Sequence, residues 1–289
     1  MKRLFHLLCL SLLFFSCNTD DDVSEQPKLV VEGWIDSGGY PIVLLTATVP
    51  ISEQGRDVKD LGDYVLRWAK VTVSDGEREV VLTGMLDKRY FPPYVYTTSR
   101  LRGEVGKTYR LTVSYSGLYA EAETFIPQPV PLDSIRVRPC EDSDTLYQIR
   151  AYFHDDPSQS AYYKFFTRIG RNQRMYLSSY IQTLDNSVFL SGEEIDVSVM
   201  RGRLITDRPN EYTPYFTEKD TVVVKFARMD SLSFLFWNQM EHNMTLSFLP
   251  VTAAKRNPQF NVKGGIGYWC GYGATFYPVV VGDSICRRR

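Results

Sequence analysis

Short runs in which apolar and polar residues alternate recur along the chain, and they restrict its fold more than any other feature. The clearest run is 109–115, where every second residue from Tyr109 is apolar or aromatic and the residues between are polar. Because successive side chains of a strand point to opposite faces, this pattern predicts a strand with one buried face. A second run at 29–35, and an Asp-Gly turn at 75–76 between two β-branched runs, predict a further strand and a hairpin. The sequence therefore predicts an all-β fold.

The strand-like runs divide into two groups, which predict two domains. Between residues 28 and 128, about seven short strands separated by regular turns are typical of an immunoglobulin-like or transthyretin-like β-sandwich. Pro127, Pro129 and Pro131 then follow closely. Since proline donates no hydrogen bond to a strand ladder, we place the domain boundary between residues 128 and 129, and residues 129–289 form a second β-rich domain.

One segment of the second domain has the period of a helix. Apolar residues recur near one face between residues 231 and 246, which predicts a single α-helix whose apolar stripe packs in the core. Asp230 or Ser231 would cap its N-terminus, because both residue types accept hydrogen bonds from the first free backbone N–H groups. The expected fold is thus mainly β, with an N-terminal β-sandwich and a second β-rich domain that carries one helix.

The N-terminal segment has the composition of a lipoprotein signal. A basic start precedes an apolar stretch over residues 4–15, which is too short to cross a bilayer as a helix, because a crossing needs about 20 residues. Ser16 precedes Cys17, the arrangement of bacterial lipoprotein signals; an ordinary signal peptide with an incidental cysteine is the alternative. We expect removal of residues 1–16, acylation of Cys17, and a polar tether over residues 17–27.

An acidic run follows the cysteine closely. It consists of Asp20, Asp21 and Asp22, and it resembles the signal that directs Bacteroidota lipoproteins to the outer face of the outer membrane. A solvated acidic linker is the alternative. We therefore expect a protein that is lipid-anchored to the outer membrane and faces the extracellular side. The formal net charge is −1 and no basic stripe is present, so nucleic acid is not an expected partner.

Few residues have the spacing of a catalytic or metal site. After the two N-terminal cysteines, three others remain: Cys140, Cys270 and Cys286. Without a CxxC pair they do not predict zinc, and whether any two form a disulfide stays open. The only local seed for chemistry is His154-Asp155-Asp156, where a polar turn is the alternative to a metal or acid–base cluster. The sequence therefore predicts no catalytic residue, metal or cofactor.

The segment 264–273 combines five glycines with aromatic residues. Glycine inside a strand indicates a bulge or the close approach of another backbone. Tyr268, Trp269 and Tyr272 would either form an exposed surface for a ligand or protein partner, or pack inward while the glycines let a kinked strand close the second domain. The sequence leaves both alternatives open.

Several short motifs occur in a distinctive order along nearly the whole chain after residue 17. They are the run 31–35, then Gly106 with Tyr109, Leu111 and Val113, and then 126–127, 132–135, 156–157, 162–163 and 264–268. In this order and spacing they resemble a Bacteroidota surface lipoprotein family known only as domain of unknown function four-two-four-nine. Trp269-Cys270 departs from the family pattern, which more usually has a phenylalanine and a small residue there.

The resemblance implies a partner of TonB-dependent outer-membrane receptors, with an accessory role in nutrient capture or uptake and no assigned catalytic residues. We therefore expect a lipid-anchored binding protein without catalysis, whose partner is such a receptor and whose ligand is a small nutrient, glycan or peptide. A surface hydrolase acting on glycans or peptides is the first alternative. An adhesin or structural surface protein is the second.

Overall fold

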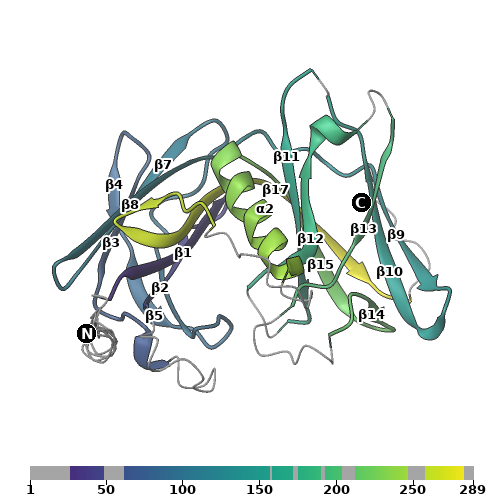
Figure 1. Cartoon of the computed structure of the whole chain (residues 1–289), viewed down its shortest axis with the longest axis horizontal. Coiled ribbons are helices and arrows are strands. Elements are labelled where there is room, and N and C mark those ends of the chain that lie inside the picture. The colour runs from purple at the N-terminus through teal and green to yellow at the C-terminus, as the bar shows by residue number, and fades with distance from the viewer. Residues whose placement is uncertain are drawn as a thin grey trace, which may run out of the picture.

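Three β-sheets and one α-helix make up the fold in the part of the chain that the structure describes (Figure 1). This computed structural model describes residues 27–48, 62–156, 158–171, 175–189, 193–203, 212–246 and 258–282. Within these ranges the predicted all-β class with a single helix is confirmed. The signal segment, Cys17, the acidic run 20–22 and Cys286 lie outside the described residues.

The largest sheet has eight strands and runs through both halves of the chain. In spatial order they are β12 (Leu177–Asp185), β11 (Tyr162–Ile169), β15 (Thr221–Met229), β17 (Gly265–Val280), β1 (Leu29–Asp36), β2 (Ile42–Ala47), β6 (Tyr94–Thr97) and β5 (Thr83–Leu86). The first and last described strands, β1 and β17, therefore lie side by side at its centre.

Two smaller sheets complete the fold. The five-stranded sheet has the order β16 (Val262–Lys263), β8 (Leu118–Phe125), β7 (Thr108–Tyr115), β3 (Lys70–Ser74) and β4 (Glu79–Val81). The four-stranded sheet has the order β13 (Ile195–Val199), β10 (Ser143–Phe153) and β14 (Phe216–Thr217), with β9 (Ser134–Cys140) also paired to β10.

The long strand β17 joins the two halves. Its first part pairs in parallel with β1, from Gly265 opposite Leu29 to Tyr272 opposite Asp36. Its second part pairs antiparallel with β15, and Figure 1 shows the strand passing behind the helix from one half to the other. The C-terminal strand thus pairs with strands from both sides of the predicted boundary at 128/129, and the two segments share one sheet.

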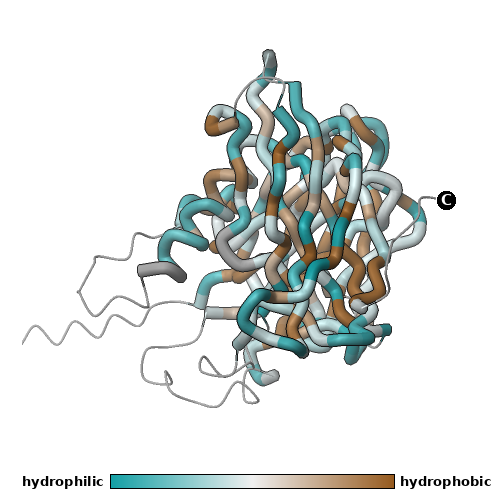
Figure 2. The backbone as a smooth tube through the Cα atoms, turned by 90° about the vertical axis from the view of Figure 1, so that its right-hand side faces the viewer, coloured by the Kyte–Doolittle hydropathy of each residue, from teal (hydrophilic) through white to brown (hydrophobic). Residues whose placement is uncertain are grey.

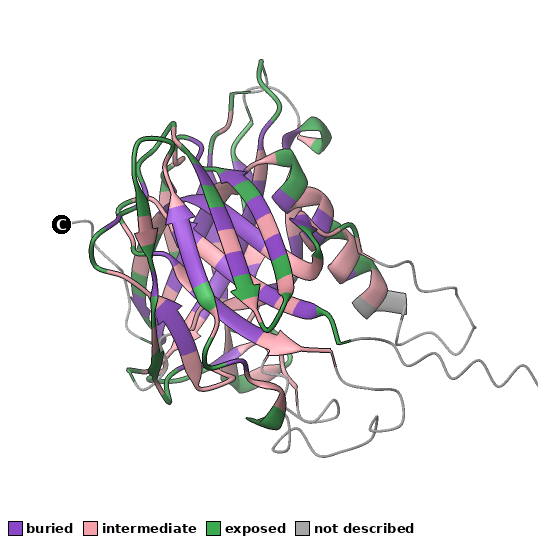
Figure 3. Ribbon diagram, turned by 90° about the vertical axis from the view of Figure 1, so that its left-hand side faces the viewer, coloured by how far each residue is buried: buried purple, intermediate pink, exposed green. Residues whose placement is uncertain are grey.

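Each half has its own apolar core. The first core takes residues from 29–126 together with Val262 and Trp269, and the second takes residues from 132–281. Strands show the expected alternation: in β1 every second residue from Leu29 is buried and those between are half-buried. The alternation is visible along the strands in Figure 3, and Figure 2 shows apolar stretches gathered inside with hydrophilic loops around them.

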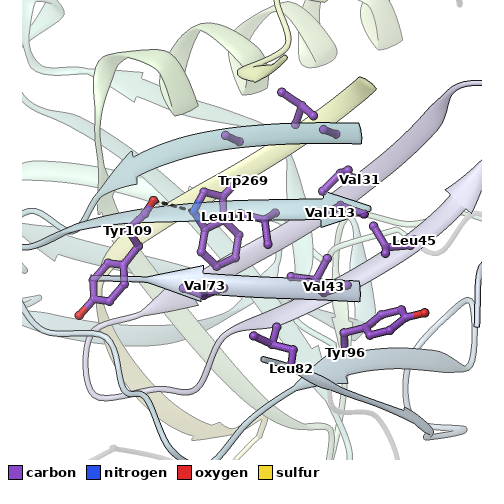
Figure 4. Close-up of a cluster of buried hydrophobic side chains, with 14 of the residues drawn as sticks. Val31, Val43, Leu45, Val73, Leu82, Tyr96, Tyr109, Leu111, Val113 and Trp269 are labelled. Carbon is purple, nitrogen blue, oxygen red and sulfur yellow. Dashed lines mark hydrogen bonds between the residues drawn. The ribbon is translucent and has the colours of Figure 1, made fainter. Parts of the chain in front are cut away.

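Trp269 is the largest side chain of the first core. It is completely buried, and its Nε1 donates a hydrogen bond to the backbone oxygen of Tyr109 at 3.0 Å (Figure 4). Gly33 makes room for the indole, because a Cβ at position 33 would lie 2.8 Å from Trp269 Cε3. The exposed-surface alternative is therefore wrong for Trp269, which packs inward.

The glycines of β17 allow other backbones to approach closely, as the sequence predicted. Gly267 has a φ of +112°, and a Cβ there would lie 1.9 Å from the backbone oxygen of Val31. At Gly273 an added Cβ would lie 2.1 Å from the backbone oxygen of Pro127. No other residue type fits either position without displacing the backbone.

The helix α2 (Ser231–Leu246) begins and ends where the sequence predicted. Asp230 caps it, since its Oδ1 accepts a hydrogen bond from Ser233 N at 2.7 Å. Its Oδ2 accepts bonds from Thr124 Oγ1 at 2.9 Å and from Phe125 N at 3.1 Å. One carboxylate thus caps the helix and fixes its start to the end of β8.

Within the described ranges, every helix is too short or too polar to cross a bilayer.

Candidate functional site

A cavity of about 480 Å³ lies between one face of the eight-stranded sheet and α2. The register brings its floor together from distant parts of the chain: Glu32 lies opposite Tyr268, and Asp36 lies opposite Tyr272. Side chains two residues apart on a strand share a face, so Trp34 lies on the same side as Glu32. The opposite side of β1 faces the first core.

Aromatic rings form a large part of the cavity wall. From the sheet come Trp34, Phe166, Tyr268 and Tyr272, and from α2 come Phe236 and Trp237. The rings contact one another: the centroid of Tyr268 lies 4.8 Å from Phe236 and 5.2 Å from Trp237. Trp237 Nε1 donates a hydrogen bond to the Tyr272 hydroxyl at 2.8 Å. These contacts hold the wall in place before any ligand arrives.

A buried ion pair lies beside the cavity, which its lysine lines. Lys225 Nζ donates to Asp36 Oδ1 at 2.5 Å, and the two side chains are 2% and 13% exposed. The ammonium also lies 4.2 Å from the ring centroid of Tyr272 and 4.8 Å from that of Phe166. Burial lowers the pKa of Lys225, and the Asp36 carboxylate opposes that change.

A second buried pair fixes the helix to the sheet. Lys164 of β11 donates to Glu241 of α2, and both side chains are buried. The same carboxylate accepts hydrogen bonds from the backbone nitrogens of Gln182 at 3.1 Å and Thr183 at 3.0 Å. Burial lowers the pKa of Lys164, and Glu241 opposes the change. The pair therefore sets the distance between α2 and the floor.

Glu32 differs from these two acids because its partner is neutral. Its Oε1 accepts a hydrogen bond from the Tyr268 hydroxyl at 2.8 Å. The side chain is half-buried, since it faces the cavity. Burial raises the pKa of Glu32, and the hydrogen bond from Tyr268 opposes that rise. Burial, together with the nearby Glu32, also raises the pKa of Tyr268 well above its ordinary value.

A second cavity of about 320 Å³ adjoins the first. Trp34 and Tyr176 line both cavities, and Asp36 lines the second while its partner Lys225 lines the first. The Asp36–Lys225 pair thus lies at the boundary between the two cavities.

The structure divides the three aromatic residues predicted as a candidate surface. Tyr268 and Tyr272 line the cavity, whereas Trp269 points to the opposite face of the sheet. The predicted core stripe of α2 also divides: Phe236 lines the cavity, and Leu232 is 48% exposed.

Sequence reasoning missed the charged residues of the cavity layer. They are Glu32, Asp36, Lys164, Lys225 and Glu241. A signal was present for three of them, because Glu32, Lys164 and Lys225 each interrupt an apolar run that reads as a strand. A lone charge at such a position is buried only with a partner or a polar cavity beside it.

The predicted chemical seed at 154–156 is a polar turn in which each side chain has a different partner. His154 Nδ1 lies 2.7 Å from Asp133 Oδ2, and both side chains are exposed. Asp155 accepts a hydrogen bond from the Tyr163 hydroxyl. Asp156 accepts one from the backbone nitrogen of Ser158 at 3.0 Å. Over the described ranges, no group of His, Cys, Asp and Glu side chains is placed to hold a metal ion.

The two described cysteines are both free thiols. Cys270 lies in the layer beneath α2, is completely buried, and has its pKa raised by that burial to about 12. Cys140 is half-buried at the end of β9. Neither thiol lines the larger cavity.

No curated protein is found to match this chain. A family model described as a domain of unknown function (DUF4249) matches residues 15–275. The matched range includes every residue that lines the larger cavity, both buried ion pairs and the whole of α2. The chain therefore belongs to this family, the domain of unknown function DUF4249.

Proposed function

We propose that this protein is a lipid-anchored binding protein of the cell surface, which holds a small ligand in the cavity between α2 and the eight-stranded sheet. The cavity itself carries the proposal: it has a volume of about 480 Å³, and aromatic rings form a large part of its wall. Pockets for small molecules are typically ~300–1,000 Å³, mostly apolar, and supplied with a few polar groups that orient the ligand. Glu32 and Lys225 are such groups here.

In this proposal the anchor and the partner follow from the N-terminal sequence and the family pattern. Cys17 carries the lipid, and the run 20–22 directs a Bacteroidota protein to the outer face of the outer membrane. A TonB-dependent receptor then accepts the nutrient that the cavity captures. The lipoprotein-like order of basic start, apolar stretch and cysteine supports the anchor, and the family resemblance supports the receptor.

Binding is better supported than catalysis by the way the charged groups are used. Lys164 and Lys225 are each held by a carboxylate, which stabilises the fold and leaves both ammoniums hydrogen-bonded. A general acid or base needs a position within hydrogen-bond reach of a substrate in a cleft. His154 instead lies exposed with Asp133, away from the cavity lining.

The test combines co-purification with a variant that fills the cavity. The full chain is purified in detergent from its native membrane, and molecules released by denaturation are identified by mass spectrometry, beside any co-purified β-barrel protein. Ser178→Trp places an indole in the cavity wall, whereas Ser114→Trp adds one on an exposed face of β7 as the matched control. We expect a small molecule with the wild type and the control but not with Ser178→Trp.

Three results would count against the proposal. These are no bound molecule in the wild type, equal loading of Ser178→Trp, and a mature chain without lipid at Cys17. The receptor partnership would be refuted if no β-barrel receptor co-purifies and deletion of the protein causes no growth defect on any nutrient. The binding cavity would then still be judged by the first two results.

A further inference from the structure

Glu32 is the acidic side chain of the cavity wall for which the described part of the chain supplies no cation. Asp36 and Glu241 each pair with a lysine. Among the described residues, Glu32 receives only the neutral hydroxyl of Tyr268, on one of its two oxygens. A carboxyl group withdrawn from water and left without a counter-charge is unfavourable when ionised, so the free protein holds an uncompensated acid against an aromatic cavity.

Aromatic side chains line the same cavity as this acid. Trp34 follows Glu32 on the same face of β1, and the ring of Tyr268 is fixed beside it by the hydrogen bond. Phe236 and Trp237 of α2 then extend the ring cluster from Tyr268 across the cavity. An acid with several ring faces is the arrangement that attracts an organic cation, because each face carries negative electrostatic potential.

The chain already holds two of its own ammonium groups in this way. Lys225 Nζ lies 4.2 Å from the ring centroid of Tyr272 and is bonded to Asp36. Lys164 Nζ lies 4.7 Å from that of Trp237 and is bonded to Glu241. In both cases one carboxylate and neighbouring rings hold a buried cation. Glu32 lies with Trp34 and Tyr268 in the wall of the cavity, but among the described residues no such cation is bonded to it.

We propose that the cavity takes a ligand with an organic ammonium group, which binds Glu32 among the rings of Trp34 and Tyr268 while an apolar body fills the space beneath α2. This inference rests on the proposed binding function and specifies the class of ligand. Arg203 also lines the cavity, so an anionic ligand is the competing outcome. We favour the cationic ligand, because Glu32 is an acid and because Lys225, which lines the wall together with Arg203, is already bonded to Asp36.

Three probes of one shape and different charge test the inference. They are 1-naphthylmethylammonium, 1-naphthylmethanol and 1-naphthoate, titrated by calorimetry into the purified full chain at neutral pH. We expect the ammonium to bind about tenfold more tightly than the alcohol, which corresponds to about 1.4 kcal/mol, and the naphthoate to bind most weakly. In Glu32→Gln, which keeps a hydrogen-bond acceptor for Tyr268, the ammonium should lose this advantage while the alcohol binds as before.

Two further variants separate the role of Glu32 from a general effect on folding. Glu79→Gln removes an exposed acid of β4 and should leave all three affinities unchanged. Trp34→Leu keeps Glu32 but removes one ring, and should weaken the ammonium more than the alcohol.

Each alternative outcome has a distinct meaning. Tightest binding of naphthoate, equal binding of alcohol and ammonium, or an ammonium preference that survives in Glu32→Gln would overturn the ligand class and leave the binding function standing. If none of the probes binds and no molecule co-purifies with the wild type, both proposals fall.

Discussion

Removal of Asp36 from its pair with Lys225 should destabilise the fold far more than removal of a surface ion pair. Lys225 is 2% exposed and its ammonium has Asp36 as its carboxylate partner. Breaking a buried pair from one side typically costs about 3–5 kcal/mol, because the remaining charge is stranded in a poorly solvated place. We expect Asp36→Asn to lower the free energy of unfolding by about 3 kcal/mol, since asparagine keeps a hydrogen bond but no charge.

The reverse substitution should cost less. Lys225→Met leaves Asp36, which is 13% exposed and lines the second cavity, where water can solvate it. We expect a loss of about 1–2 kcal/mol. The double variant should recover most of the loss, because replacing both partners of a buried pair is often nearly neutral.

Urea unfolding followed by tryptophan fluorescence and circular dichroism measures all of these changes. The control is Glu123→Gln, which breaks the ion pair of Glu123 with Arg110. The Arg110 side chain is 60% exposed and that of Glu123 is 55% exposed. It should leave the unfolding midpoint unchanged within error. If Asp36→Asn costs no more than this control, or if the losses of the two single variants simply add in the double variant, the reasoning about the buried pair is refuted.

Four further predictions follow from the same structure. Gly267→Ala should lower the free energy of unfolding by about 3 kcal/mol, because its Cβ would meet a backbone oxygen of β1. The control Gly76→Ala, also at positive φ but in open space, should cost only about 1 kcal/mol. Equal losses of the two variants in thermal melts would contradict the explanation. Asp230→Ala should cost about 2 kcal/mol, since it removes the helix cap and two bonds to β8; a change within error in urea titrations would argue against the cap. Cys270 should react with a thiol reagent only in denaturant, because it is buried with a pKa of about 12; labelling of the native chain at this site, seen by peptide mapping, would show the opposite. Burial raises the pKa of Glu32, so the folded state binds its proton more tightly than the unfolded state, and the wild type should lose stability as pH rises above the ordinary glutamate pKa of 4.5. Glu32→Gln lacks this loss, so its stability relative to wild type should increase over the same rise in pH, and a constant difference would contradict the pKa shift.

The sequence predicted local structure well because the signals for local structure are local. Alternation identified the strand β7, and the apolar period with Asp230 located α2 at its observed ends. The β1–β17 pairing was not predictable, since the period of a strand defines which face is buried but not which partner it will have. The predicted second domain therefore included the strand that completes the sheet of the first half.

The site was only partly predictable for the same reason. The glycines and aromatics of 264–273 identified the right segment, and Tyr268 and Tyr272 do line the cavity. Their partners Glu32 and Asp36 lie more than two hundred residues earlier in the chain, at positions fixed by the parallel register. No pattern within one segment of a single sequence reveals that register. The ion pairs and the cavity could therefore be identified only from the three-dimensional structure.

The central place of β17 has a consequence for how the protein can be made. Until residue 280 has been synthesised, β1 and β15 each present an open edge, because the strand that bridges them follows β1 by more than two hundred residues. Open edges of this kind promote pairing between molecules, and contacts between distant segments form slowly. We therefore expect the nascent polypeptide to be prone to association, and a C-terminal deletion that stops before Gly265 removes Tyr268 and Tyr272 from the cavity and the strand that joins β1 to β15.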